Sequence, residues 1–391
     1  MVHEPPEQTG TPEFPRRRFM RDVATAATVT CLSPSLLSGC QATTGSTASA
    51  NADAMEQALE MMSGLAPLTN HGPMAAEALV ALGRADRVVA WVEGYKKRFS
   101  DGYPATRQPI TRENWREGLG DGNRVADWTN FFNRELKEAA WPQVLKQWLA
   151  ILAPGLAAAA AHGVIRTGHA VRSLSVKETD LRRRELAEGL GYWAAYYQPL
   201  PASRTSPPGS LKPSQAVAQV ETMPVEWRGG GSIMHALRRL DGFAPFANVA
   251  DMVDCSGDAS RFLSDLTETF AAQCLTQPRH LIAFIPAVTG PSAIRLLLPH
   301  LTPEARQSVL RYGWQAAAAI YAAFGSAAGA GAIADRKQDR EDLIGRAVTN
   351  GDEHAIKFTE VCLREYALNP KPVYLLAARH AIDRLPPAAS S

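Results

Sequence analysis

Helical periodicity recurs along most of this sequence and limits the fold more than any other feature. Apolar residues return every three to four positions, which places them on one face of a helix. Signals for strands, meaning alternating β-branched residues between tight turns, are nearly absent. We therefore predict an all-α fold. The predicted helical blocks are 74–85, 124–152, 154–174, 181–197, 232–240, 259–276, 291–298, 303–325, 336–349, 352–366 and 372–384.

Two long irregular stretches interrupt the helical pattern. Residues 99–122 and 198–227 are rich in proline, glycine and serine. Loops of this length in a compact domain bind ligands, act as lids or wrap over a core. The second stretch could also link two helical halves, but Trp193 and Tyr196 directly before it favour packing into one core. We predict a single multi-helix domain over residues 54–385.

The first 39 residues have the pattern of an export signal. The pair Arg16-Arg17, followed by Phe19, resembles the twin-arginine motif that a receptor of the export machinery reads. A weakly apolar stretch follows, and the segment that ends in Cys40 (LSGC) resembles a bacterial lipobox, whose cysteine receives lipid. The alternative is a disordered basic N-terminus with a chance cysteine.

This signal predicts where the protein resides. The mature chain would begin at Cys40, on the periplasmic or cell-surface side, and lipid would anchor it to a membrane. The twin-arginine (Tat) export machinery would be its transport partner. Residues 40–53 are small and polar with nothing to bury, so we expect a flexible tether between lipid and domain.

Charge, cysteine content and missing motifs exclude several functional classes. The formal net charge is +2 and no basic stripe with interleaved aromatic residues occurs, so nucleic acid is not an expected partner. Cys255, Cys274 and Cys362 lack metal-type CxxC spacing, and either one disulfide or free buried thiols would suit them. No GxSxG, GxGxxG or P-loop motif is present. A tightly held nicotinamide is therefore not supported.

His162 and His169 lie seven residues apart in one predicted helix. Seven residues make close to two turns, so both imidazoles share a helix face with Arg166 between them. Gly163 and Gly168 each cost the helix roughly 1 kcal/mol relative to alanine, which indicates close approach of another helix or a ligand. This face could bind a metal, or its histidines could form hydrogen bonds with packed neighbours, and both interpretations stay open.

Histidines also lie near the starts of other predicted helices. His354 and Lys357 share a helix face, where a buried ammonium is costly unless it is paired, modified or deprotonated. The positive end of a helix favours neutral, metal-binding imidazole at His71, although an exposed turn residue is the alternative. His280 opens an apolar run and could be a ligand or a helix-start residue. Histidines from separate helices fit a mononuclear metal inside a helical body.

At these residues the sequence resembles the questin oxidase-like family. The resemblance implies a helical oxidoreductase, with fungal members that oxidise and open anthraquinone rings in a Baeyer–Villiger-like step. It also implies a small aromatic or quinone-like substrate, dioxygen as co-substrate and an external reductant such as NADPH. The matching segments are 70–84 (NHGPMAAEALVALGR), 141–174 with its core HGVIRTGHA, 185–201, 280–301 and 352–366.

The resemblance further implies a non-haem iron bound by several histidines, and a helix lysine that can be carboxylated. By position, the implied site residues are the ligands His71, His162 and His354, the modified Lys357, and His169 or His280 as a further ligand. We also expect Arg166 to orient an anionic substrate or peroxide group. Trp193 and Tyr196 would line the pocket.

One position departs from the family's pattern. A histidine is expected in the segment 283–290 (AFIPAVTG), where this chain has Pro286. If that histidine is a ligand, the iron coordination here is incomplete or uses His280 instead. The competing hypothesis is therefore a catalytically inactive, lipid-anchored protein that binds a small molecule on the same fold.

Overall fold

The computed structural model describes residues 54–63, 70–98, 108–203, 209–228, 231–326 and 338–388. Contacts divide the chain into two units, Met1–Thr43 and Thr44–Ser391. The predicted export signal with Arg16, Arg17, Phe19 and Cys40 lies outside the described residues, as does the predicted tether 40–53.

Helices build the second unit, and its described ranges contain no β-strand, so the all-α prediction is confirmed. Residues 54–61 are helical. The α-helices that follow are α2 (Gly72–Ala81), α3 (Ala85–Lys96), α4 (Val125–Glu138), α5 (Trp141–Leu152), α6 (His162–Val176), α7 (Asp180–Ala195), α8 (Pro213–Ala216), α9 (Ile233–Arg238), α10 (Ala259–Thr276), α11 (Leu281–Leu297), α12 (Pro303–Phe324), α13 (Arg340–Asn350), α14 (Glu353–Leu368) and α15 (Pro372–Arg384). The described parts of both predicted irregular stretches contain short helical turns, and the second also contains Gln198 and Leu211 in isolated β-bridges.

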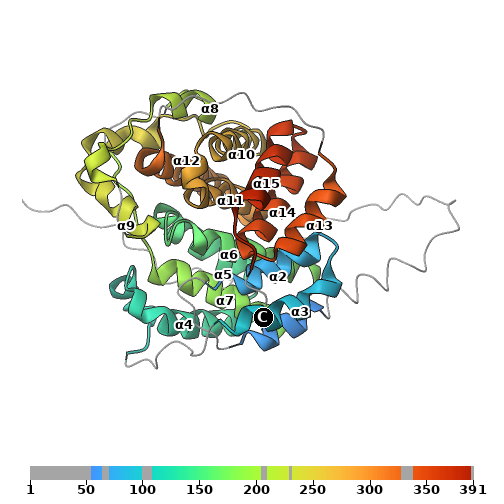
Figure 1. Cartoon of the computed structure of the whole chain (residues 1–391). Coiled ribbons are helices and arrows are strands. Elements are labelled where there is room, and N and C mark those ends of the chain that lie inside the picture. Colours follow the sequence, from blue (N-terminus) through green and yellow to red (C-terminus); the bar gives the residue numbers. More distant parts are fainter. Residues whose placement is uncertain are drawn as a thin grey trace, which may run out of the picture. The chain divides into compact units, whose positions relative to one another are not determined.

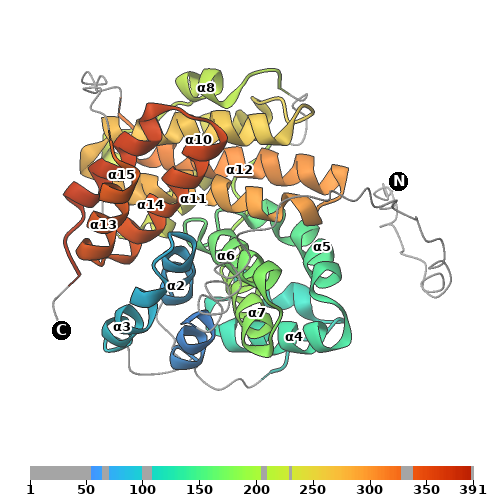
Figure 2. The same cartoon turned by 90° about the vertical axis from the view of Figure 1, so that its right-hand side faces the viewer.

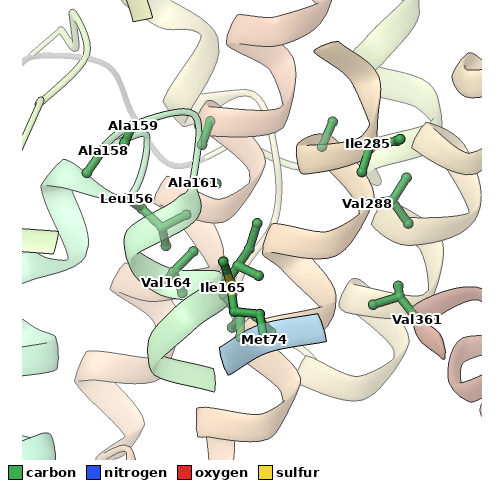
Figure 3. Packing of buried hydrophobic residues seen from close by; sticks show 14 of the residues in the cluster. Met74, Leu156, Ala158, Ala159, Ala161, Val164, Ile165, Ile285, Val288 and Val361 are labelled. Atoms are coloured by element: carbon green, nitrogen blue, oxygen red, sulfur yellow. The ribbon is translucent and has the colours of Figure 1, made fainter. Parts of the chain in front are cut away.

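The helices form two layers that follow the order of the chain. Helices α2 to α7 lie together in one layer, and α10 to α15 lie in the other (Figures 1 and 2). The layers meet where α11 contacts α6 and where α14 contacts α2. Buried apolar side chains fill this boundary, among them Met74, Ile165, Ile285 and Val361 (Figure 3).

The alanine-rich stretch before His162 is not α-helical, although we predicted one helix over 154–174. Ala159, Ala160 and Ala161 have φ angles of 48°, 57° and 66°, in the left-handed region. An L-residue there costs roughly 1–2 kcal/mol. Helix α6 therefore begins only at His162. Apolar composition cannot reveal such a reversal, because alanine favours the right-handed helix.

Helix α11 passes through two prolines. The predicted block started at Pro291, but α11 begins at Leu281 and contains both Pro286 and Pro291, although proline normally ends a helix. The segment Pro278–His300 is long and apolar enough to cross a membrane by length and composition, with a mean hydropathy of 1.8. In the structure, 78% of this segment's most apolar 18 residues are buried inside the protein. Helix α11 is therefore a core helix, which contacts α6 in one layer and α10, α12 and α14 in the other.

The glycines of α6 allow close helix packing. A Cβ atom on Gly163 would lie 2.7 Å from Cβ of Trp193 in α7, and one on Gly168 would lie 3.0 Å from Cβ of Ala293 in α11. Both distances are shorter than ordinary carbon contacts. The predicted close approach is confirmed, and the partners are helices.

Candidate metal centre

Three histidines from three helices meet at the boundary between the layers. His71 is the N-cap of α2, His162 is the first residue of α6, and His354 lies in the first turn of α14. The ring centroid of His71 lies 4.7 Å from that of His162 and 4.6 Å from that of His354. One possible ligand nitrogen from each ring lies within 4.8 Å of the other two. We call these three residues the histidine cluster.

Close packing fixes His71 at the entry to α2. A Cβ atom on Gly72 would lie 2.3 Å from Sδ of Met62 and 2.8 Å from Cε1 of Tyr95, so any larger residue there would displace one of these side chains. The backbone N–H of His71 donates to the hydroxyl oxygen of Tyr95 at 2.9 Å. These contacts hold the first turn of α2, and with it the imidazole of His71.

A backbone carbonyl contacts the imidazole of His162, and a carboxylate contacts that of His354. Nδ1 of His162 lies 2.6 Å from the carbonyl oxygen of Ala159, which places a proton on Nδ1 and leaves Nε2 as the free acceptor. The carboxylate of Asp352 caps α14, because it accepts from the backbone N–H of His354 at 2.8 Å and of Ala355 at 3.2 Å. The same carboxylate lies 3.3 Å from Nδ1 of His354.

Burial and nearby positive charge keep the imidazoles of His71 and His162 neutral. Burial lowers the pKa of His71 well below its usual value, and Lys357 and His162 lower it further. Burial and Lys357 also lower the pKa of His162 to about 3. The N-terminal ends of α2, α6 and α14 add partial positive charge at the same place. Neutral imidazole is the form that binds metal ions.

Lys357 lies beside the cluster in the core. It is 4% exposed, and its Nζ lies 3.2 Å from Nδ1 of His71. Burial lowers the pKa of Lys357 to about 8, against the opposing effects of Glu353 and Asp352. About a tenth of the Lys357 amine is therefore neutral at pH 7, far more than for a lysine in water.

The residues present fit a metal ion. Imidazole nitrogens suit iron, zinc, copper and nickel. Asn70, beside His71, is 2% exposed, and its Oδ1 accepts from the backbone N–H of Gly72 at 3.2 Å. Its Nδ2 is buried without a hydrogen-bond partner in the described part of the chain. An unpaired buried donor costs about 1–3 kcal/mol of stability. A ligand that accepts a hydrogen bond from Asn70 would remove this cost, so the unpaired donor supports a ligand-binding site here.

A second set of residues, the charged layer, lies further along the same three helices, with Glu77, His169 and Glu360 buried and the side chain of Arg172 18% exposed. It consists of Glu77 on α2, His169 and Arg172 on α6, and Glu360 on α14. Nδ1 of His169 and Nε of Arg172 each lie 2.6 Å from a carboxylate oxygen of Glu77, and Arg172 also donates to Glu360. Burial raises the pKa of both carboxyl groups, but Arg172 together with His169 at Glu77 and with Arg364 at Glu360 outweighs burial, so each pKa is lowered and both groups are ionised.

Several predicted site residues have other surroundings. His169 belongs to the charged layer. Arg166 is 2% exposed and donates to Glu185 at 2.7 and 2.8 Å and to Glu188 at 2.6 Å, so these carboxylates on α7 occupy the guanidinium that was expected to orient an anionic substrate. The ring of His280 packs 5.7 Å from that of Phe324 instead of within the histidine cluster.

The predicted pocket residues lie in the packing of α7. Trp193 is fully buried, and its indole N–H donates to the carbonyl oxygen of Gly155 at 3.0 Å. The ring of Tyr196 lies 4.6 Å from that of Tyr192 and is partly buried. Neither side chain has a contact that points to a substrate. Pro286, at the position where a histidine was expected, lies within α11.

Sequence reasoning missed the residues that support the cluster. Glu77, Arg172 and Glu360 carried a detectable signal, because each follows a cluster residue on the same helix by six to ten residues and has apolar residues near it in the sequence. Tyr95 carried no signal, because its contact with His71 depends on how the chain folds between α2 and α3.

One comparison with known proteins found a match. The family model described as questin oxidase-like matches residues 68–362, a range that contains the histidine cluster, Lys357 and the charged layer. No curated protein matches the chain. The family points to an oxidoreductase. Since the match covers most of the sequence and all of the candidate site, the chain belongs to the questin oxidase-like family.

Proposed function

We propose that this protein is a non-haem iron-dependent oxygenase that acts on a small aromatic or quinone-like molecule. The convergence of His71, His162 and His354 beside Lys357 carries the proposal. Iron, when bound, would supply the redox chemistry that activates dioxygen. The family's resemblance extends the proposal to a Baeyer–Villiger-like or ring-opening oxidation, with a reductant such as NADPH.

The chain's own residues would prepare the site. The neutral imidazoles of His71 and His162 provide nitrogen ligands without first losing a proton. His354 has a side chain 22% exposed, so one side of the cluster is open to small molecules. The buried donor of Asn70 would hydrogen-bond an oxygen atom that enters the site. Burial of the remaining ligands excludes bulk water.

Carboxylation of Lys357 would complete the ligand set. The neutral amine of Lys357 adds to carbon dioxide, so that an N–C bond forms and one proton leaves to solvent. The product is an anionic oxygen donor of the kind that accompanies histidines at non-haem iron. We expect a carbamate carbon signal in NMR spectra of protein prepared with ¹³C-labelled bicarbonate, and no such signal from Lys357→Arg.

Metal analysis tests the main proposal. Protein purified after expression with iron should contain iron, and His71→Ala, His162→Ala and His354→Ala should each lose it. His280→Ala is the matched control and should keep the metal. Wild-type protein without iron, or full activity of His162→Ala, would contradict the proposal and leave a small-molecule-binding protein as the better reading.

We also propose that the protein is exported and lipid-anchored. The proposal rests on Arg16, Arg17, Phe19 and Cys40 in the sequence. Twin-arginine export carries folded proteins, which would suit a helical protein that takes up its metal before transport. Fractionation of cells should find the wild type in membranes, Cys40→Ala released from them, and the double variant Arg16→Lys/Arg17→Lys retained in the cytoplasm. A cytoplasmic wild type would refute it.

A further inference from the structure

An ion pair lies beside the histidine cluster. Nη2 of Arg98, which follows α3, donates to Oε2 of Glu353 in the first turn of α14 at 2.9 Å. The side chain of Arg98 is 42% exposed and that of Glu353 is 13% exposed. His354, the cluster member on α14, follows Glu353 directly, and its side chain is 22% exposed. The pair therefore joins the part of the cluster that solvent reaches.

The carboxylate of Glu353 lies among the possible ligands of a metal ion. One of its oxygens lies within 4.8 Å of a ring nitrogen of His354, the same limit that relates the three cluster histidines to one another. Burial lowers the pKa of Lys357, and Glu353 opposes this effect more strongly than Asp352 does. Nζ of Lys357 in turn lies 3.2 Å from Nδ1 of His71. Glu353 is thus close to the cluster from two sides, and carboxylate oxygen accompanies imidazole at non-haem iron.

Arg98 is anchored on the side of the cluster where α3 lies. Its guanidinium carbon lies 4.5 Å from the centre of the Tyr95 ring, which is a cation–π distance. The hydroxyl oxygen of Tyr95 accepts the backbone N–H of His71 at 2.9 Å. Helix α3 lies beside α2, and α2 lies beside α14 (Figure 1). One tyrosine of α3 therefore positions both a ligand of the cluster and the cation that holds Glu353.

We propose that Arg98 is a specificity-determining residue, which withholds the carboxylate of Glu353 from the metal ion. The inference deepens the proposed function and rests on it for the presence of the ion. The guanidinium fixes where the carboxylate lies and neutralises its charge, so the carboxylate attracts a second cation less. The anionic ligand of the ion then comes from another donor, such as carboxylated Lys357. No bond is made or broken in this step.

Cobalt(II) is the probe for this role, because its binding to imidazole needs no oxygenase activity. Metal-free full-length protein is titrated without bicarbonate, so that Lys357 stays unmodified. Arg98→Met should bind Co²⁺ roughly 10-fold more tightly than the wild type, because Glu353 then adds a negative charge to the ligands. The absorption spectrum of the bound Co²⁺ should also change, since an oxygen ligand joins the nitrogens.

A double-mutant cycle separates a released ligand from a lost repulsion. Removing the positive charge of Arg98 favours a cation with or without Glu353, whereas a new ligand requires Glu353. The gain from Arg98→Met should therefore be much smaller when Glu353→Gln is already present. An equal gain in both backgrounds would overturn the proposal, and so would weaker binding by a folded Arg98→Met variant.

Arg84→Met is the matched control. Arg84 also lies at an end of α3 and pairs with a glutamate, Glu341, at 2.7 Å, with a side chain 31% exposed. It should leave the affinity for Co²⁺ unchanged. Both pairs are exposed and contribute little to stability, so both variants should fold, which circular dichroism checks.

The outcomes also separate this inference from the proposed function. A wild type that binds neither iron nor Co²⁺ would refute the metal centre and the role of Arg98 with it. A wild type that binds metal, together with an Arg98→Met variant of unchanged affinity and spectrum, would refute only the role of Arg98.

Discussion

Replacing Arg172 with methionine should strongly destabilise the protein. Arg172 is the cation that joins Glu77 of α2 to Glu360 of α14, and its side chain is 18% exposed while the two carboxylates are 8% and 4% exposed. Removing one partner of a buried ion pair costs about 3–5 kcal/mol, because an uncompensated charge stays in the core. Glu77 keeps His169 and Glu360 keeps Arg364, so we expect the lower end, about 3 kcal/mol.

Urea denaturation followed by circular dichroism would measure this loss. The matched control is Arg183→Met, since Arg183 also contacts two carboxylates but its side chain is 43% exposed. Exposed pairs contribute about 0–1 kcal/mol, so the control should change the free energy of unfolding little. Equal losses in both variants would refute the reasoning.

A charge-neutral variant separates stability from geometry. Arg172→Met/Glu77→Gln/Glu360→Gln removes all three charges at similar volume, which in other proteins is neutral or stabilising. If the charged layer also holds α2, α6 and α14 in register, the triple variant should fold stably yet bind Co²⁺ about 10-fold more weakly, as changes behind metal ligands do. Wild-type affinity in the stable triple variant would show that the layer does not position the ligands.

Three further perturbations test other features. In metal-free protein, Lys357→Met should be more stable than the wild type by about 3 kcal/mol at pH 7, from the difference between pKa values of about 8 folded and 10.5 unfolded. Because the folded pKa is the lower one, wild-type stability rises with pH between 8 and 10.5, and the gap measured by urea titration should close there. Gly163→Ala should cost about 1–3 kcal/mol in thermal melts through overpacking, whereas Gly345→Ala, with open space around it, should gain about 0.5–1 kcal/mol. Ala159→Gly should raise the melting temperature by relieving about 1 kcal/mol of left-handed strain, whereas Ala158→Gly, which lacks a positive φ, should lower it.

The sequence predicted the helices better than the contacts between them. Periodicity located α12 and α14 within a few residues, because each presents a regular apolar face to the core. It failed where tertiary packing overrides local preference. Pro286 inside α11 and the left-handed Ala159–Ala161 turn both cost free energy locally. Contacts with other parts of the chain must stabilise both, and local sequence patterns do not reveal those contacts.

At the candidate site, too, the sequence identified residues better than it identified their contacts. His71, His162 and His354 were named as ligands through the family resemblance, and the structure places them together. Spacing alone could not separate His162 from His169, because both lie on the face of α6 that meets α2. Whether a histidine of α6 joins the cluster depends on the residue that α2 places opposite it. Glu77 of α2 lies opposite His169, so His169 pairs with a carboxylate instead.

The position of the cluster at three helix starts limits which ligand can complete it. The neutral imidazoles of His71 and His162, partial positive charge from α2, α6 and α14, and the amine of Lys357 supply no anionic ligand. The nearest carboxylates are those of Asp352 and Glu353, which form a second possible ligand group with His354. Asp352, however, caps α14, and Glu353 pairs with Arg98 at 2.9 Å. An anionic donor must therefore come from a modified Lys357 or from a bound anion. Lys357 is the better placed of the two, because its amine already contacts His71 and burial has already moved its pKa toward the neutral form that carboxylation requires.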